Sequence, residues 1–254
     1  MLAIDLSGRV AVVTGGSGEL GRVMCQTLAA AGAKVAVHYR SGEERAERVV
    51  EAIRSAGGEA RAYAADITVG AEVESLAARV SADLGPAHIV VTNAVAQYTW
   101  TSVLEQAPED YESQFRSCVL QNVHMAKAFV PGMIAAGWGR IVAINTECAM
   151  QNFVGQSAYV SGKRGMDGVL RVLAKEIGEH GITVNQVAPG WTVSDKIRAL
   201  PDDPQAEYAK GVPLRRAGTD QEIANVVAFL ASDLASYITG AYVPVCGGNV
   251  MPTI

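Results

Sequence analysis

Hydrophobic and polar positions divide the chain into two alternating kinds of segment. Short apolar runs rich in valine, alanine and isoleucine predict buried strands, and the amphipathic stretches between them predict helices. Strands are expected at 10–14, 34–38, 60–64, 88–92, 140–145, 183–187 and 241–245. Helices are expected at 19–31, 41–56, 69–84, 109–136, 156–179 and 220–230. The spacing of Ser41 and Glu44 predicts a capping box at the start of the second helix.

The alternation of strand and helix continues almost to the end of the chain. Strands that are apolar throughout fit a parallel sheet covered by helices on both faces, so the fold class is α/β. We find no linker, repeat or low-complexity stretch, and we therefore predict one domain over residues 1–254. The weakest pattern lies at 191–211, around a Pro-Asp-Asp-Pro turn. This segment is either a substrate lid or a plain surface excursion.

The amino-acid composition limits which binding partners and which cellular compartment we expect. Of the 254 residues, 49% are hydrophobic and 19% are charged, and the net charge is −5. This balance argues against nucleic acid or an anionic membrane as the main partner. No apolar run approaches the ~18 residues of a membrane span, and residues 1–5 lack the features of a signal peptide, so we expect a cytoplasmic protein. The four scattered cysteines do not form a metal-binding pattern, and we expect no metal site.

A glycine-rich loop, Thr14-Gly15-Gly16-Ser17-Gly18-Glu19-Leu20-Gly21, joins the first strand to the first helix. Glycines at such a turn allow a pyrophosphate to approach the backbone, where its charge meets the helix N-terminus. A glycine loop alone is weak evidence, and the alternative is a turn that binds nothing. Its position at the start of an alternating chain favours dinucleotide binding.

The end of the second strand indicates which dinucleotide is preferred. An acidic residue there would bind the ribose 2′-hydroxyl, whereas an arginine would accept a 2′-phosphate. The chain has His38-Tyr39-Arg40-Ser41, which favours NADP over NAD, although Arg40 could simply be a solvated residue. Asp66, after the third strand, could accept a hydrogen bond from the adenine amine, or it could cap the segment that follows.

Tyr159 and Lys163 lie four residues apart in the helix expected at 156–179. This spacing places the phenol and the ammonium on one helix face. A nearby positive charge favours the ionised phenol and lowers its pKa, which would suit proton transfer at neutral pH. The alternative is a surface lysine that extends past a half-buried tyrosine.

Taken together, these motifs resemble the short-chain dehydrogenase/reductase family, and in particular its 3-oxoacyl-carrier reductases. Further matching segments are Thr92-Asn93-Ala94, Gly139-Arg140-Ile141-Val142, Val187-Ala188-Pro189-Gly190, Ile238-Thr239-Gly240 and Gly247-Gly248. The resemblance implies a Rossmann-type doubly wound sheet and hydride transfer between a nicotinamide and a ketone or secondary alcohol. It also implies a homotetramer that buries the helices at 109–136 and 156–179.

The resemblance assigns roles to individual residues. Tyr159 matches the general acid, Lys163 the residue that lowers the tyrosine pKa and holds the nicotinamide ribose, and Thr146 the family's serine. The threonine hydroxyl can still donate to a carbonyl oxygen, and its methyl group narrows the pocket. The expected cofactor-binding residues are Gly15, Ser17, Gly18, Leu20, Gly21, Arg40, Asp66, Ile67, Asn93, Tyr159, Lys163, Pro189, Gly190 and Thr192, with Ser194 as a second hydroxyl beside Thr192.

Several positions depart from the family pattern. Cys118 stands where the family has an asparagine that organises a proton relay, so we expect the relay to run through water or Asn122. Val95 replaces a glycine and is expected to crowd the cofactor side of the pocket. Glu19 is at a position that weakens phosphate binding if the charges are close. These departures motivate an alternative function, a cofactor-binding scaffold or sensor without catalysis, and a third hypothesis is a dehydratase or epimerase.

The remaining polar and aromatic residues near these motifs are harder to assign. Glu147 follows Thr146 and could be a second acid, a substrate anchor or, as we expect, an exposed loop charge. Tyr98, Trp100 and Gln151 are expected at the substrate mouth, and Trp191 in packing. We have no physical account of Cys246.

Overall fold

The computed structural model describes residues 3–193, 198 and 205–252. A parallel seven-stranded sheet has the order β3-β2-β1-β4-β5-β6-β9. Its strands are β1 (Val10–Val13), β2 (Lys34–Tyr39), β3 (Ala60–Ala64), β4 (Ile89–Thr92), β5 (Gly139–Ile144), β6 (Ile182–Pro189) and β9 (Tyr242–Val245). The strand order reverses between β1 and β4, as in a doubly wound Rossmann-type sheet. The predicted α/β fold class is therefore confirmed.

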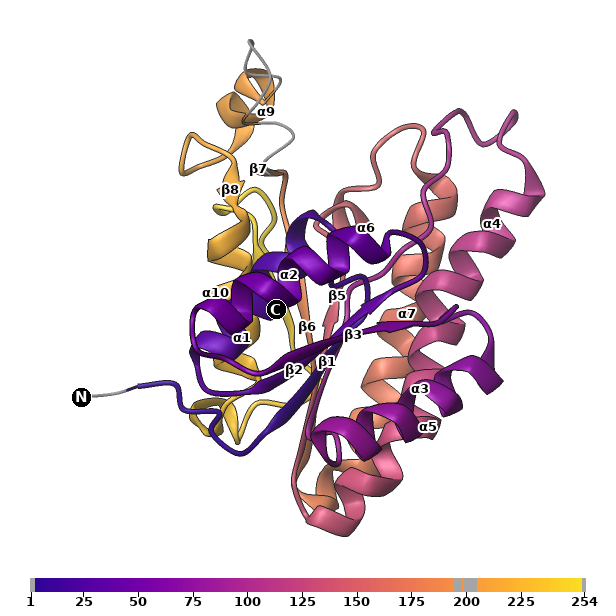
Figure 1. Ribbon diagram of the computed structural model, residues 1–254. Coiled ribbons are helices and arrows are strands. Elements are labelled where there is room, and N and C mark those ends of the chain that lie inside the picture. Colours follow the sequence, from indigo (N-terminus) through magenta and orange to yellow (C-terminus); the bar gives the residue numbers. More distant parts are fainter. Residues whose placement is uncertain (1–2, 194–197, 199–204, 253–254) are drawn as a thin grey trace.

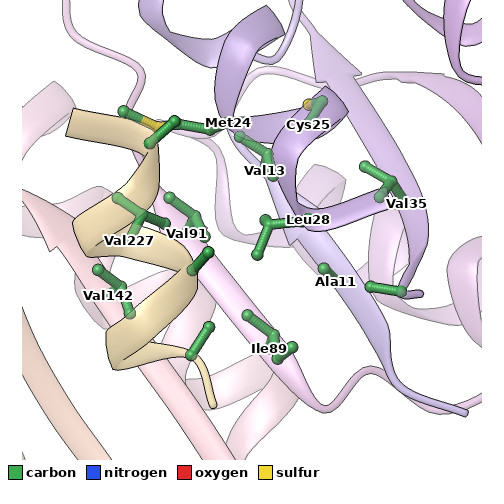
Figure 2. Close-up of a cluster of buried hydrophobic side chains, with 14 of the residues drawn as sticks. Ala11, Val13, Met24, Cys25, Leu28, Val35, Ile89, Val91, Val142 and Val227 are labelled. Atoms are coloured by element: carbon green, nitrogen blue, oxygen red, sulfur yellow. The ribbon is translucent and has the colours of Figure 1, made fainter. Parts of the chain in front are cut away.

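Helices cover both faces of the sheet (Figure 1). On one face lie α1 (Glu19–Ala30), α2 (Glu43–Ser55) and α10 (Asp220–Leu230), and on the other lie α3 (Gly70–Leu84), α5 (Gln121–Ala136) and α7 (Ser157–Ile177). Each face has its own buried hydrophobic cluster. Figure 2 shows part of the first cluster, in which Met24 and Leu28 of α1 and Val227 of α10 lie over Val13 and Val91 of the sheet. Apolar burial on both faces explains why the strands have no polar side.

The predicted helix at 109–136 is not a continuous α-helix. It consists of α4 (Pro108–Gln114), a π-helical segment η1 (Phe115–Leu120) and α5. A π-helical turn inserts an extra residue and often accompanies a functional site. Cys118 lies in this segment. The interruption therefore falls where the family resemblance places its relay residue.

Two details of the sequence-based elements are wrong or incomplete. The capping box at Ser41 and Glu44 does not form, because α2 starts after Gly42, whose φ is 114° and which provides no side-chain cap. A capping box does form at α10, where Thr219 and Glu222 bond reciprocally. The pattern also did not predict the short helix α6 (Cys148–Gln151) or the parallel pairing of β7 (Thr192–Val193) with β8 (Gly218–Thr219).

The segment expected to be a lid is only partly described. Residues 194–197 and 199–204 lie outside the described part of the chain. After them comes α9 (Ala206–Gly211), which lies with β7 and β8 at one end of the molecule (Figure 1). Within the described ranges, no helix combines the length and apolar character needed to cross a bilayer.

Candidate active site

The glycine loop lies at the carboxyl end of β1, beside the carboxyl end of β4. This is the reversal point of the strand order, where doubly wound sheets form a ligand crevice. Gly15 has a φ of 64°, a conformation that favours glycine. A Cβ on Gly21 would overlap the Gly15 carbonyl, whose carbon would be 2.8 Å away. The loop therefore needs glycine at both positions to fold back on the first turn of α1.

His38 holds this loop in place, a role that the sequence reasoning missed. Its side chain is only 1% exposed, and its Nδ1 accepts from the Gly15 N–H at 3.1 Å. Its Nε2 lies 2.9 Å from the Ala65 carbonyl, so the neutral tautomer that donates from Nε2 satisfies both contacts. Burial lowers the pKa of His38, which favours this neutral form. The histidine ties the ends of β1, β2 and β3 together.

A second network ties the loop to β4 and α5. The Thr14 hydroxyl donates to Gln121 Oε1 at 2.6 Å and accepts from the N–H groups of Asn93 and Ala94 at 2.9 and 3.1 Å. Asn93 Nδ2 donates to the Thr14 carbonyl at 3.0 Å, and Gln121 Nε2 donates to the Ala94 carbonyl at 2.9 Å. Asn93 thus shapes the crevice through its side chain. In the sequence, Thr14 stands out only as the first residue of the glycine-rich motif, and Gln121 gives no signal.

The residues expected at the adenosine side differ in exposure. Arg40 is exposed at the end of β2. Burial opposes ionisation of Asp66, but hydrogen bonds from Thr68 and the charge of Arg40 hold the pKa of Asp66 below its ordinary value. Asp66 Oδ1 accepts from both the N–H and the hydroxyl of Thr68. The capping role considered for Asp66 is therefore present, and the adenine contact stays a prediction.

The other residues expected at the cofactor have mixed environments. Ser17 and Leu20 are partly exposed in the loop and the first turn of α1, and Leu20 lines the cavity described below. Ile67 is buried in the core cluster under the second face. Glu19 is exposed in the first turn of α1. Whether Glu19 weakens phosphate binding stays a prediction.

The structure brings Thr146, Tyr159 and Lys163 together at the carboxyl end of β5. Tyr159 interacts with the Thr146 side chain, and its ring centroid lies 5.7 Å from Lys163 Nζ. Lys163 is 4% exposed, and its Nζ donates to the Ile144 carbonyl. Lys163 is therefore not a lysine extended over the surface. The expected cluster forms, with the phenol and ammonium on one face of α7.

The expected lowering of the Tyr159 pKa by Lys163 stays a prediction, because burial sets the net direction of the pKa in this structure. Burial raises the pKa of Tyr159 above its ordinary value, and the interaction with Thr146 only opposes this rise. Burial also lowers the pKa of Lys163, because removing water penalises its charged form. Desolvation is therefore the largest influence on the pKa of both groups. Tyr159 is held in its protonated form, which is the form that donates a proton.

The relay position and its proposed substitute are both buried. Cys118 interacts electrostatically with Tyr159 and Lys163, so it does lie beside the cluster. Asn122, by contrast, accepts from the Thr92 hydroxyl and donates to the Cys118 carbonyl, each at 2.7 Å. Both halves of the Asn122 amide are engaged with the scaffold, which favours water over Asn122 as the relay. Val95 lines the cavity and packs against the second hydrophobic cluster.

A cavity of about 1020 Å³ opens beside these residues. Its polar wall includes Asn93, Thr146, Tyr159, Lys163 and Thr192, and its apolar wall combines aromatic and aliphatic side chains. As expected, Tyr98 and Trp100 line it: the Tyr98 hydroxyl accepts from the Tyr159 N–H at 2.8 Å, and Trp100 stacks on Tyr159. Gln151 instead donates to the Asn249 carbonyl at 3.3 Å. The cavity is large enough to hold a substrate beside the reactive part of a dinucleotide.

Glu147 is buried, and its assignment as an exposed loop charge is wrong. It is 3% exposed and lines the cavity. Its Oε1 accepts from the Tyr208 hydroxyl at 2.8 Å, and its Oε2 accepts from Asn249 Nδ2 at 3.0 Å. Burial raises the pKa of Glu147, while these hydrogen bonds oppose the rise. The partners lie 61 and 102 residues away, so sequence spacing could not reveal this site.

The turn after β6 completes the wall. The Pro189 carbonyl accepts from the Glu147 N–H at 2.9 Å, and the Thr192 hydroxyl donates to the Gly190 carbonyl at 3.0 Å. The Tyr208 hydroxyl packs on Gly190, where a Cβ would clash with it. Trp191 meets Tyr208 edge to face at 5.6 Å, which fits its expected packing role. Ser194 lies outside the described residues.

Comparison with known proteins agrees with this arrangement. The family model described as "Enoyl-(Acyl carrier protein) reductase" matches residues 17–249. The 3-oxoacyl-[acyl-carrier-protein] reductase FabG of Pseudomonas aeruginosa is 36% identical over 98% of this chain and 100% of its own length. The FabG protein of Escherichia coli K12 is 37% identical, also over 98% of this chain and 100% of its own length. The chain belongs to the short-chain dehydrogenase/reductase family.

A solved structure supports the same conclusion for the fold. A putative gluconate dehydrogenase from Agrobacterium tumefaciens superposes with a TM-score of 0.92 and 29% sequence identity, covering 100% of both chains. Members of the short-chain dehydrogenase/reductase family are oxidoreductases, and this chain is one by descent. The relatives are named for two different substrate types, a carrier-bound 3-oxoacyl group and a sugar acid. Family membership therefore leaves the substrate to be argued from the cavity.

Proposed function

We propose that the protein is an NADP(H)-dependent oxidoreductase that interconverts a ketone and a secondary alcohol, with a 3-oxoacyl-type or related carbonyl as substrate. The observation that carries this proposal is the convergence of Thr146, Tyr159 and Lys163 in a cavity that is also lined by Leu20, which follows the glycine loop. A tyrosine beside a buried hydroxyl and a buried lysine can bind and protonate a carbonyl oxygen.

Each residue of the cluster has a chemical task in this proposal. The Thr146 hydroxyl orients the substrate carbonyl, and Tyr159 donates the proton that the carbonyl oxygen needs on reduction. Tyr159 carries its proton at neutral pH, as a phenol of ordinary or raised pKa does. Lys163 supports the proton step from behind Tyr159, and water beside the cluster resupplies the proton.

The crevice at the reversal point fits a dinucleotide, because glycine at 15 and 21 lets the loop fold tightly against the first turn of α1 without side chains at these positions. When bound, the nicotinamide supplies or accepts the hydride. Gly15, Ser17, Gly18, Leu20 and Gly21 would hold the pyrophosphate side. Arg40 and Asp66 would hold the adenosine side, and Asn93, Lys163, Pro189, Gly190 and Thr192 the nicotinamide side. The exposed Arg40 at the end of β2 supports NADP over NAD.

Cofactor oxidation tests the proposal. The absorbance of NADPH and of NADH is followed with a panel of ketones that includes a 3-oxoacyl thioester. We expect turnover with NADPH and a lower kcat/KM with NADH. Arg40→Ser should reduce that preference for NADPH while leaving the rate with NADH within about threefold. Lack of turnover on every ketone with either nucleotide would contradict the proposed reaction.

A catalytically impaired scaffold is the competing function, and Cys118 at the relay position is the observation that favours it. Tight nucleotide binding without turnover would support that alternative. Cys118→Asn distinguishes the two, because restoring the amide should create turnover in a scaffold but change an active enzyme only modestly. We favour the enzyme because Thr146, Tyr159 and Lys163 lie together in the cavity, with Thr146 and Lys163 buried.

We also propose a homotetramer that buries the long helices against neighbouring subunits. Phe115 and Val172 lie on these helices with 51% and 56% of their surfaces exposed. A groove between η1 and α7, lined by Tyr111, Phe115, Arg116 and Leu120 among others, lies on the same side. Light scattering should report a tetramer for the wild type and smaller species for Phe115→Asp. A wild-type monomer would contradict this assembly.

A further inference from the structure

The described lining of the cavity has more acidic than basic side chains. Among the described lining residues, Lys163 is the only basic side chain, whereas Glu147 and Glu207 are both acidic. The lysine Nζ is already committed to the Ile144 carbonyl beside Tyr159. Arg164 follows Lys163 and donates to the Ala149 carbonyl at 2.6 Å, and Arg198 is paired with Asp220 at 2.7 Å. The described wall therefore offers no cation dedicated to a carboxylate or phosphate on the substrate.

The hydrogen bonds of Glu147 indicate that it carries a negative charge. Tyr208 and Asn249 each donate to a different carboxylate oxygen. Hydrogen bonds donated to both oxygens favour the ionised carboxylate over the protonated acid. Because Glu147 is held by groups from α9 and the C-terminal segment, it cannot easily turn away from the cavity. Its charge is therefore fixed beside Thr146, the residue that meets the reacting carbonyl in the proposed function.

The rest of the wall matches an uncharged body. Aromatic side chains from four different segments surround the space: Tyr98, Trp100, Phe153, Trp191 and Tyr208. Such surfaces bind apolar and aromatic groups, and their ring faces are themselves electronegative and so disfavour anions. Glu147 and the aromatic wall therefore both disfavour the binding of an anionic group.

We propose that Glu147 is a specificity-determining residue that excludes ketones bearing a carboxylate near the carbonyl, so that the enzyme takes uncharged substrates with an apolar or aromatic body. This inference rests on the proposed function only for placing the reacting carbonyl at Thr146 and Tyr159. It separates the two substrate types of the relatives, because an acyl thioester is uncharged near its ketone and a sugar acid is not. A fixed charge in a partly desolvated cavity repels an anion much more strongly than it would in water.

The test uses two unreactive product-like ligands that differ only in charge. 2-Hydroxy-2-phenylacetamide and 2-hydroxy-2-phenylacetate, which carry the amide or carboxylate on the carbinol carbon, are titrated into the protein in a calorimeter, first without nucleotide and then with saturating NADPH. We expect the neutral amide to bind at least tenfold more tightly than the carboxylate in both series. Equal affinities, tighter binding of the carboxylate, or no binding of the amide would overturn the proposal.

Two variants locate the effect. Glu147→Gln keeps the shape of the side chain and should reduce the ratio of the two affinities to about threefold or less. Glu207→Gln is the matched control, because Glu207 also lines the cavity but its side chain is 86% exposed and paired with Lys210. That variant should leave the ratio unchanged, since an exposed and paired charge is screened.

The outcome is independent of the proposed reaction. Binding without nucleotide requires neither turnover nor NADP, so loss of the charge preference and loss of ketone reduction are separate results. The wild-type ratio alone decides the proposal if Glu147→Gln fails to fold, which a thermal unfolding curve would show. An undiminished ratio in folded Glu147→Gln would assign the discrimination elsewhere and contradict the role of Glu147.

Discussion

The two walls of the active site are built in different ways. The cofactor wall consists of loops that directly follow β1, β2 and β4, and its polar groups bond to the neighbouring strand ends, as Thr14 and His38 do. The substrate wall joins β5 to α9 and the C-terminal segment, and Glu147 meets Tyr208 and Asn249 across 61 and 102 residues. The strand ends of the sheet set the position of the cofactor wall. The position of the substrate wall depends on segments that are distant in sequence and pack back onto the site. We expect substitutions to damage the two walls in different measurements.

A substitution that disturbs packing in the glycine loop should have the largest effect on stability. In Gly21→Ala, the new methyl group would overlap the Gly15 carbonyl, so the loop or the start of α1 must shift. Overpacking against backbone costs about 3 kcal/mol of unfolding free energy, and NADPH affinity should fall with it. Urea unfolding and nucleotide titration measure the two effects.

Gly168→Ala is the matched control for that substitution. Gly168 lies in α7, and nothing within 4 Å obstructs an added Cβ. Alanine in a helix interior should stabilise the protein by about 0.5–1 kcal/mol. Similar destabilisation by both substitutions would show that the close approach at Gly21 is not the cause.

The hydroxyl of Thr14 should be the next most important feature of the cofactor wall. Thr14→Val keeps the shape but leaves the Asn93 and Ala94 N–H groups and Gln121 Oε1 without this partner. We expect a loss of about 1–3 kcal/mol in the free energy of unfolding. Thr183→Val serves as the control, because the buried Thr183 Oγ1 has no hydrogen-bond partner among the described residues. If both substitutions proved equally harmless, the network around Thr14 would not stabilise the crevice.

Tyr208→Phe probes the substrate wall and should mainly affect catalysis. It removes the hydrogen bonds to Glu147 and from the Trp191 N–H but keeps the ring that packs on Trp191. Stability should fall by about 0.5–1.5 kcal/mol, and KM for the ketone should rise while NADPH affinity stays unchanged. Tyr237→Phe, at a fully exposed tyrosine, should change none of these. A loss of NADPH affinity equal to the rise in KM would contradict the separation of the two walls.

The smallest expected effect is a pH dependence of stability that arises from Glu147. Because burial raises its pKa above 4.5 in the folded protein, the folded state retains this proton to higher pH than the unfolded state does. The unfolding free energy of the wild type should therefore decrease relative to that of Glu147→Gln as pH rises from 4.5 through the folded pKa. Urea unfolding of both proteins over this range measures the difference. A difference that is constant with pH, or that favours the wild type at higher pH, would contradict the raised pKa.

The same contrast explains what the sequence could predict. Apolar runs gave the order and nearly the bounds of all seven sheet strands, because a parallel sheet buried on both faces leaves a continuous signal. Tyr159 and Lys163 could be paired from helical spacing, and the glycine loop from its place after a strand. Glu147 was misjudged because its burial depends on Tyr208 and Asn249, whose return to the site no local pattern records. The effect of burial on the Tyr159 pKa was missed for a similar reason, since spacing reveals a neighbouring charge but not the depth of burial.

The role of Tyr159 as proton donor is the central claim, and the rate of ketone reduction in Tyr159→Phe tests it most directly. The phenylalanine keeps the ring that stacks on Trp100 and removes only the hydroxyl. We expect NADPH affinity and thermal stability close to those of the wild type, and a fall in kcat/KM of about 10²–10⁴-fold, the usual contribution of a positioned general acid. A variant that binds NADPH normally and reduces the ketone at the wild-type rate would contradict the account.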